Sequence, residues 1–228
     1  MKKAIFFDID NTLLDFDACS EEAIRLGFEE RGMTWEHALY PTFLRINNAL
    51  WQQLERGELT QEGLYAIRFD RVFAAMGIEA DGADFERGFR IRLHDLAVPM
   101  AGAGELLRSL SADFRLFAAS NGPHEQQVNR LANARLLSCF EEVFTSQRMG
   151  HSKPGRAFFD QCFALLPGLR PAECAMVGDS LTADIAGAVD YGMEAVWLNP
   201  NGAALPEEYS TVRCAADLVE VGEILMVM

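Results

Sequence analysis

The stretch that decides the fold is AIFFDIDNT, residues 4–12. Its first part, Ala4–Phe7, is a short apolar run without polar alternation, so it predicts a strand buried on both faces. Asp8 and Asp10 come directly after this run. Side chains two residues apart on an extended chain point the same way, so these two carboxylates can face one site. The pattern is also typical of a solvated turn, or of Asp10 and the residues after it capping a helix.

Four later apolar runs repeat this pattern, and helix-like segments separate them. The runs are Arg115–Ala119, Glu142–Thr145, Cys174–Val177 and Ala195–Leu198, and the helix-like segments are Glu125–Ala134, Ala157–Leu165 and Thr182–Tyr191. Strands that alternate with helices predict a parallel sheet with helices on both faces. We therefore expect an α/β fold with a Rossmann-like core.

The stretch between residues 17 and 96 differs, because it has helical periodicity and few strand-like runs. Its predicted helices are Glu21–Arg31, Pro41–Glu55, Thr60–Met76 and Asp84–Asp95. Pro99 and Gly102 then mark the return to the sheet. We expect residues 1–16 and 97–228 to form the α/β core. Residues 17–96 are expected to form a helical cap domain, inserted after the first strand.

The composition narrows the classes of function. The chain of 228 residues has a formal net charge of −14, and a strongly acidic chain repels nucleic-acid backbones. No apolar stretch approaches the roughly 20 residues of a membrane helix, and the first apolar run is too short for a signal peptide. The five cysteines form no C-x-x-C pair, so neither a zinc site nor a disulfide framework is indicated. We expect a cytoplasmic protein with neither a nucleic-acid nor a membrane partner; nothing in the sequence indicates its oligomeric state.

Polar residues follow the later runs, at the strand ends where open parallel sheets bind ligands. Ser120 and Asn121 precede a predicted helix, an arrangement that suits an anion site or simply a helix cap with a turn. Lys153 precedes another helix, and the other lysines are Lys2 and Lys3. A solvated surface lysine is the alternative for this residue.

The fourth run is followed by Asp179, and Asp184 falls at the start of the next helix. A capping or helix-dipole role is the alternative for Asp184. Carboxylates without nearby Cys or His suit magnesium rather than zinc, and close carboxylates such as Asp8 and Asp10 indicate a bound cation or a shared proton. Together the four strand ends supply a nucleophile, an acid/base, a metal site, an anion anchor and one cation. Phosphoryl transfer requires this combination.

These residues resemble the motifs of the haloacid dehalogenase superfamily of phosphatases. Asp8-Ile9-Asp10-Asn11-Thr12 is similar to the first motif, D-x-D-x-T; Ser120 corresponds to the second, Lys153 to the third, and Gly178-Asp179 with Asp184 to the fourth. The motifs occur in the family's order, and the helical insert resembles the family's cap. The resemblance implies an enzyme, a magnesium-dependent hydrolase whose partner is a small-molecule phosphate monoester.

The resemblance also implies a role for each matching residue. Asp8 would attack phosphorus and form an aspartyl-phosphate, and Asp10 would act as general acid and then base. Asp8, the backbone carbonyl of Asp10 and Asp179 would hold Mg²⁺. Asp184 would support the metal through water or orient Lys153, and Lys153 would neutralise charge on the phosphoryl group and on Asp8. Ser120 and the Asn121 amide would bind the phosphoryl oxygens. Thr12 would bind phosphate or support the nucleophile loop.

Several stretches resemble bacterial nucleoside-monophosphate 5′-nucleotidases that act on pyrimidine and non-standard nucleotides. They are Ile5–Asp8, Asn47–Gly57, Ser120–Gly122 and Trp197–Asn199. The resemblance implies that the cap largely sets the substrate. Phe16, Trp51 and Phe69 can stack on a base, although aromatic side chains at helical spacing more often belong to a core.

The sequence is also compatible with other functions. A sugar-phosphate or phosphoglycolate-type phosphatase, or a mutase, resembles this chain in its core. A non-catalytic phosphate-binding regulatory protein would be expected to lose Asp8, Asp10, Lys153 or Asp179, and all four are intact. Dehalogenases of the superfamily lack the second acidic residue, so Asp10 argues for phosphoryl chemistry. Phosphonatases use a cap lysine, and no lysine lies between Lys3 and Lys153.

Overall fold

A computed structural model describes residues 2–228 and divides the chain into two compact units. One unit comprises the chain up to Phe16 together with Ala97–Met228, and the other is Asp17–Leu96. Each unit buries apolar side chains of its own. Among the described residues, no helix is both long and apolar enough to cross a membrane.

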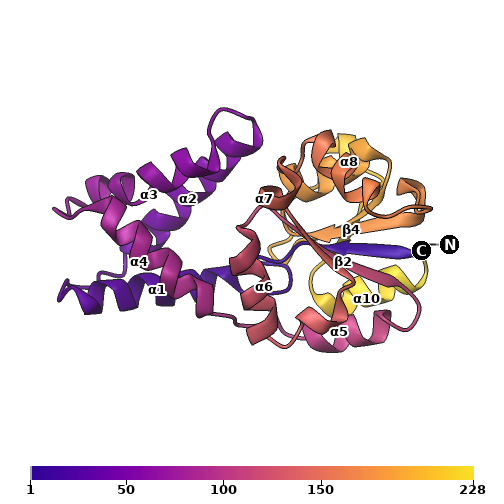
Figure 1. Ribbon diagram of the computed structural model, residues 1–228, viewed down its shortest axis with the longest axis horizontal. Coiled ribbons are helices and arrows are strands. Elements are labelled where there is room, and N and C mark those ends of the chain that lie inside the picture. Colours follow the sequence, from indigo (N-terminus) through magenta and orange to yellow (C-terminus); the bar gives the residue numbers. More distant parts are fainter. Residues whose placement is uncertain (1) are drawn as a thin grey trace. The chain divides into compact units, whose positions relative to one another are not determined.

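The first unit is built on a six-stranded sheet in which every neighbouring pair of strands is parallel (Figure 1). The strands are β1 (Ala4–Phe7), β2 (Arg115–Ser120), β3 (Glu142–Thr145), β4 (Cys174–Gly178), β5 (Glu194–Leu198) and β6 (Arg213–Ala215), in the order β3-β2-β1-β4-β5-β6. The central strand β1 pairs with β2 on one side and with β4 on the other. The strand order therefore changes direction between β1 and β4, and ligands bind at such switch points in α/β sheets.

Helices cover both faces of this sheet (Figure 1). They are α5 (Ala103–Leu110), α6 (His124–Asn133), α7 (Ser146–Met149), α8 (Arg156–Ala164), α9 (Ala186–Tyr191) and α10 (Leu218–Met226), with short 3-10 turns at Leu137–Cys139, Pro171–Glu173 and Glu207–Tyr209 and a π-helical turn, η3, at Leu181–Ile185. Alternate residues of β1 point to opposite faces. Ile5 and Phe7 pack with α5, α6 and α10, whereas Ala4 and Phe6 pack with α8 and α9. Burial on both faces explains the continuous apolar runs.

The predicted α/β fold and parallel sheet are confirmed, and the bounds of the five predicted strands agree within one residue. The sixth strand, β6, is absent from the prediction. It has three residues at the edge of the sheet, and both Arg213 and Cys214 are exposed, so it has no apolar run to find. Helices α5, α7 and α10 are also additions to the predicted elements.

The second unit is helical and has a core of aromatic rings. Its helices are α1 (Phe16–Glu30), α2 (Leu39–Glu55), α3 (Gln61–Met76) and α4 (Gly82–Asp95). The side chains of Thr60 and Asp81 cap the N-termini of α3 and α4, as hydroxyl and carboxylate groups commonly do. Buried phenylalanines fill the space between the helices: Phe28, Phe43, Phe69, Phe73, Phe85 and Phe89. Phe69 is thus a core residue, which confirms the preferred interpretation of this side chain, whereas Phe16 and Trp51 are half-buried.

One ion pair is buried inside this aromatic core. The Arg68 guanidinium donates to both carboxylate oxygens of Glu86, at 3.0 and 2.6 Å, and to Asn47 Oδ1 at 2.9 Å. All three residues are at most 4% exposed. The guanidinium also lies 4.8 Å from the centre of the Phe89 ring. A buried charge of this kind is tolerated because it is paired and hydrogen-bonded.

Replacing Glu86 by glutamine is expected to destabilise the helical unit by about 3–5 kcal/mol, because it leaves the Arg68 cation buried without a counter-charge. The measurement is urea unfolding followed by far-UV circular dichroism. Glu79→Gln, which makes the same change at an exposed position outside the helices, is the matched control. An unfolding midpoint equal to that of the control would show that the pair contributes nothing to stability.

Candidate active site

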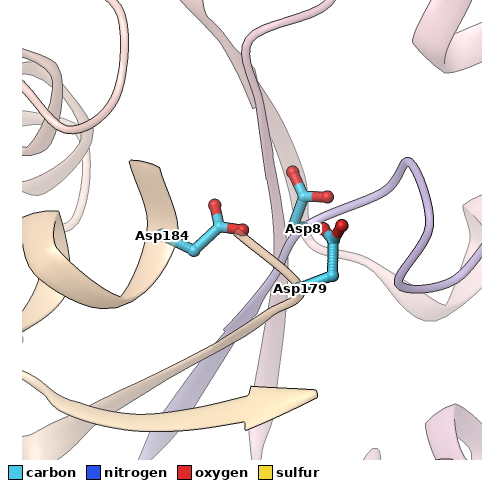
Figure 2. A group of neighbouring side chains, drawn as sticks. All are labelled: Asp8, Asp179 and Asp184. Atoms are coloured by element: carbon cyan, nitrogen blue, oxygen red, sulfur yellow. The ribbon is translucent and has the colours of Figure 1, made fainter. Parts of the chain in front are cut away.

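Three acidic side chains come together at the carboxyl edge of the sheet (Figure 2). Asp8 follows β1, Asp179 follows β4, and Asp184 lies in the turn η3. One carboxylate oxygen from each residue lies within 4.8 Å of the other two. Asp8 and Asp184 are buried, and Asp179 is half-buried. The cluster occupies the point where the strand order changes direction, between β1 and β4.

Lys153 bridges two of these acidic residues, Asp8 and Asp184, and is only 1% exposed. Its ammonium group donates to Asp8 Oδ1 at 2.7 Å, to Asp184 Oδ1 at 2.6 Å and to the backbone carbonyl of Ala119 at 2.5 Å. A lysine ammonium has three hydrogens, so each has an acceptor. The alternative of a solvated surface lysine is wrong for this residue, which fixes the position of Asp8 relative to Asp184.

The electrostatics of the cluster are set by burial and crowding. Burial raises the pKa of Asp8 from 3.8 to about 7; Lys153 opposes the rise, and Asp184 and Asp10 add to it. Burial, followed by repulsion from Asp8 and Asp184, raises the pKa of Asp179 well above its ordinary value. Burial alone would lower the pKa of Lys153, but the two ion pairs raise it above the ordinary value. When all are ionised, three carboxylates against one ammonium leave excess negative charge.

In the turn that carries Asp184, the carboxylate of this residue lies close to the backbone of Gly178. Gly178 ends β4, and a Cβ atom at this position would collide with the Asp184 carboxylate. The backbone N–H of Ser180 donates to Asp184 Oδ2 at 3.2 Å, and the Ser180 hydroxyl accepts from the N–H of Ala183. Glycine is therefore required at position 178, because the Asp184 carboxylate occupies the space that a Cβ atom would need.

Side-chain hydrogen bonds fix the loops around the cluster. The Thr12 hydroxyl accepts from the N–H of Asp179 at 3.1 Å and lies 3.4 Å from Asp179 Oδ1. The Trp197 indole N–H donates to the carbonyl of Asp179 at 2.9 Å. Asn121 donates from Nδ2 to the carbonyl of Lys153 and accepts at Oδ1 from its N–H, at 2.9 and 2.8 Å. Of the two roles expected for Thr12, these contacts favour support of the loop over phosphate binding.

Asp10 lies outside the acidic triad and contacts helix α6 instead. Gln127 Nε2 donates to Asp10 Oδ2 at 2.6 Å and to Ser120 Oγ at 2.7 Å. The Arg130 guanidinium forms an ion pair with Asp10 Oδ1. Gln127 and Arg130 are both fully buried. The predicted site residues thus form two groups. In one, Lys153 contacts Asp8 and Asp184; in the other, Gln127 contacts both Asp10 and Ser120.

Gln127 and Arg130 are absent from the residues predicted for the site. A signal for them exists, because they and Leu131 follow the spacing of one helical face. That face packs on the sheet, so polar side chains on it must find buried partners. The sequence does not indicate which partners these are, because that depends on how α6 is rotated against β2.

A parallel sheet that carries acidic and basic side chains at its switch point is the architecture of an α/β enzyme. Comparison with known proteins identifies the class more closely. The chain belongs to the haloacid dehalogenase-like hydrolase family, whose model matches residues 2–192.

Individual relatives agree with this assignment. Pyrimidine 5′-nucleotidase PynA of Streptococcus pneumoniae is 35% identical, over 87% of this chain and 84% of its own. Pyrimidine 5′-nucleotidase YjjG of Escherichia coli is 25% identical, over 97% of this chain and 96% of its own. Among solved structures, the HAD-hydrolase YfnB of Bacillus subtilis, crystallised with magnesium bound, has a TM-score of 0.92 at 31% identity and covers 98% of both chains.

Proposed function

We propose that this protein hydrolyses phosphomonoesters and that its preferred substrates are pyrimidine nucleoside 5′-monophosphates. The observation that carries the proposal is the 2.7 Å contact between Lys153 Nζ and Asp8 Oδ1 at the switch point of the sheet. A carboxylate beside a fixed ammonium can approach an anionic phosphoryl group, because the ammonium offsets their repulsion. The substrate class is supported by the relatives PynA and YjjG, which are both named pyrimidine 5′-nucleotidases.

In the proposed reaction Asp8 is the nucleophile and Asp10 is the acid and base. An oxygen of Asp8 forms a bond to phosphorus while the bond from phosphorus to the ester oxygen breaks, and Asp10 gives that oxygen a proton. A water molecule then attacks the phosphorus of the aspartyl-phosphate. Asp10 takes a proton from this water while the bond between phosphorus and Asp8 breaks. The products are the alcohol and inorganic phosphate, and both carboxyl groups return to their starting states.

The phosphoryl oxygens would be bound by the Ser120 hydroxyl, the Asn121 backbone N–H and the Lys153 ammonium. The side chain of Asn121 forms two hydrogen bonds to the backbone of Lys153. These bonds hold the loop after β2 and the loop that carries Lys153 in a fixed relative position. Fixed donors of this kind stabilise charge without reorganising during the reaction. All three anchors belong to the unit that contains the sheet.

We infer that the metal of this site is Mg²⁺. Asp8, Asp179 and the backbone carbonyl of Asp10 would hold it, and Asp184 would support it while orienting Lys153. The donors fit, because the triad offers oxygen ligands only and carries excess negative charge that a divalent cation would neutralise. When bound, the ion would supply positive charge to the phosphoryl oxygens and to the crowded carboxylates.

The test of the proposed function is phosphate release from a panel of nucleoside monophosphates and sugar phosphates, in Mg²⁺ and in EDTA. We expect hydrolysis led by UMP, dUMP or dTMP, and a loss of release in EDTA that added Mg²⁺ restores. The Asp8→Asn variant, run on the same panel, identifies any contaminating phosphatase.

Two other outcomes of this test would contradict part or all of the proposal. Preference for sugar phosphates would retain the chemistry and overturn the nucleotide substrate. Absence of magnesium-dependent release from every ester, in folded wild-type protein, would contradict the hydrolase proposal and favour a mutase or a phosphate-binding protein.

A further inference from the structure

Two fully buried polar side chains of α6 lie beside Asp10. Gln127 Nε2 contacts Asp10 Oδ2 at 2.6 Å, and Arg130 is ion-paired with Asp10 Oδ1. Both carboxylate oxygens of Asp10 thus accept from the same helix, although the Asp10 side chain itself is 30% exposed. Charge-assisted hydrogen bonds to both oxygens hold a carboxylate in one orientation more firmly than neutral contacts do.

The Gln127 amide has only one orientation that satisfies its neighbours. Its oxygen accepts from Arg130 Nη1 at 3.2 Å, which a nitrogen in that place could not do. Its two N–H groups then face Asp10 Oδ2 and Ser120 Oγ, at 2.6 and 2.7 Å. One side chain therefore links the proposed acid/base to the proposed phosphate anchor, and Arg130 sets its orientation.

The same contacts determine what the Ser120 hydroxyl can do. Its oxygen accepts from the N–H of Gly122 at 3.0 Å and from Gln127 Nε2 at 2.7 Å. A hydroxyl oxygen has two lone pairs and one hydrogen, so with both lone pairs engaged the hydrogen is left to donate to an incoming phosphoryl oxygen. A Cβ atom at Gly122 would collide with the Gln127 side chain, so the glycine allows the glutamine to come this close.

We propose that Gln127 and Arg130 are positioning residues of the reaction. They hold the Asp10 carboxyl group in line for proton transfer to the ester oxygen and from water, and they orient the Ser120 hydroxyl as a donor. This role rests on the proposed function, because it acts through the acid/base step described above. It assigns a catalytic purpose to buried polar groups of α6 that belong to none of the four motifs.

The test uses Gln127→Met, which keeps the length of the side chain and removes its donors, and Gln126→Met as the matched control at the neighbouring half-buried position. The substrates are phenyl phosphate, whose leaving oxygen needs a proton, and 2,4-dinitrophenyl phosphate, whose leaving oxygen does not. For Gln127→Met we expect kcat/KM to fall by about 10²-fold or more on phenyl phosphate and by less than about tenfold on the dinitrophenyl ester.

A second readout separates the two halves of the reaction. If Asp10 is misplaced, water attack on the aspartyl-phosphate slows as well, so the variant should release a burst of dinitrophenolate that approaches one equivalent per enzyme before a slow steady state. A residue with only a structural role would lower both esters equally and produce no new burst. Near-UV circular dichroism confirms that each variant is folded.

Variants of Arg130 give an independent check. Arg130→Met should show the same split between the two esters, and Arg130→Lys, which keeps a positive charge for Asp10, should recover part of the phenyl phosphate activity. Equal losses on both esters, or a Gln127→Met variant that matches the Gln126→Met control, would overturn the positioning role while leaving the proposed function in place. Folded wild-type protein that releases phosphate neither from these two esters nor from any nucleoside monophosphate would overturn both proposals.

Discussion

Replacing Lys153 by methionine is expected to lower kcat/KM for a nucleoside monophosphate by about 10³-fold or more, even at saturating Mg²⁺. The variant removes three hydrogen bonds at once, to Asp8, to Asp184 and to the carbonyl of Ala119. It also removes the ammonium that is paired with two of the three clustered carboxylates. An anionic phosphoryl group would then approach Asp8 without this counter-charge. The measurement is steady-state phosphate release, with circular dichroism to show that the protein folds.

Lys3→Met is the matched control for this variant. Lys3 is an exposed lysine whose ion pair with Glu173, at 2.6 Å, lies outside the acidic cluster. Its loss should leave activity unchanged. Lys153→Arg should be nearly as inactive as Lys153→Met, because a planar guanidinium cannot direct hydrogens to the three acceptors as an ammonium does. Activity of Lys153→Met within tenfold of wild type would contradict the role of this lysine.

The positions of three candidate site residues could be predicted because a parallel sheet has a simple geometry. Buried strands appear as apolar runs, and the carboxyl ends of neighbouring strands meet at one edge. Asp8, Ser120 and Asp179 each stand at the end of such a run, and the pairings of β1 with β2 and β4 bring these ends side by side. The burial of the run was therefore enough to place the residue that follows it.

Contacts made from helices could not be predicted in the same way. The helical periodicity of residues 125–134 indicates a buried face, but the rotation of that face against β2 decides which group Gln127 meets. The burial of Lys153 has a similar cause. A lone lysine in a sequence is usually solvated, and only the joint position of Asp8, Asp184 and the Ala119 carbonyl makes a buried ammonium stable.

Thr12 shows a third limit of the sequence. Its place in the first motif associated it both with phosphate binding and with loop support. Its hydroxyl accepts a hydrogen bond from the backbone N–H of Asp179, 167 residues further along the chain. Such a partner follows from the pairing of β1 with β4, but the side chain's rotamer, which selects between the two roles, leaves no trace in the sequence.

Replacing Asp8 by asparagine is expected to abolish phosphate release and, in EDTA at pH 8, to raise the melting temperature by roughly 5 °C. The first effect follows from loss of the proposed nucleophile. The second follows from the charge crowding around Asp8, because asparagine keeps an oxygen for Lys153 but carries no charge. The measurement is thermal unfolding of wild type and variant, in EDTA and in Mg²⁺. Asp190→Asn, which removes an exposed carboxylate from α9, is the control.

The raised pKa of Asp8 explains why the variant is expected to be more stable than wild type, and why the difference should depend on pH. Burial raises the pKa of Asp8 from 3.8 to about 7 in the folded, metal-free protein. Between these values the folded state holds a proton that the unfolded state has released, so the Asp8 contribution to stability falls as the pH rises, by up to about 1.4 kcal/mol per pH unit. The difference between variant and wild type should therefore be small near pH 4 and largest above pH 7. It should shrink in Mg²⁺, because a bound cation favours the ionised carboxylate. A variant less stable than wild type at pH 8 in EDTA would contradict this account, in which crowding of the carboxylates lowers the stability of the metal-free protein and the proposed Mg²⁺ would relieve it.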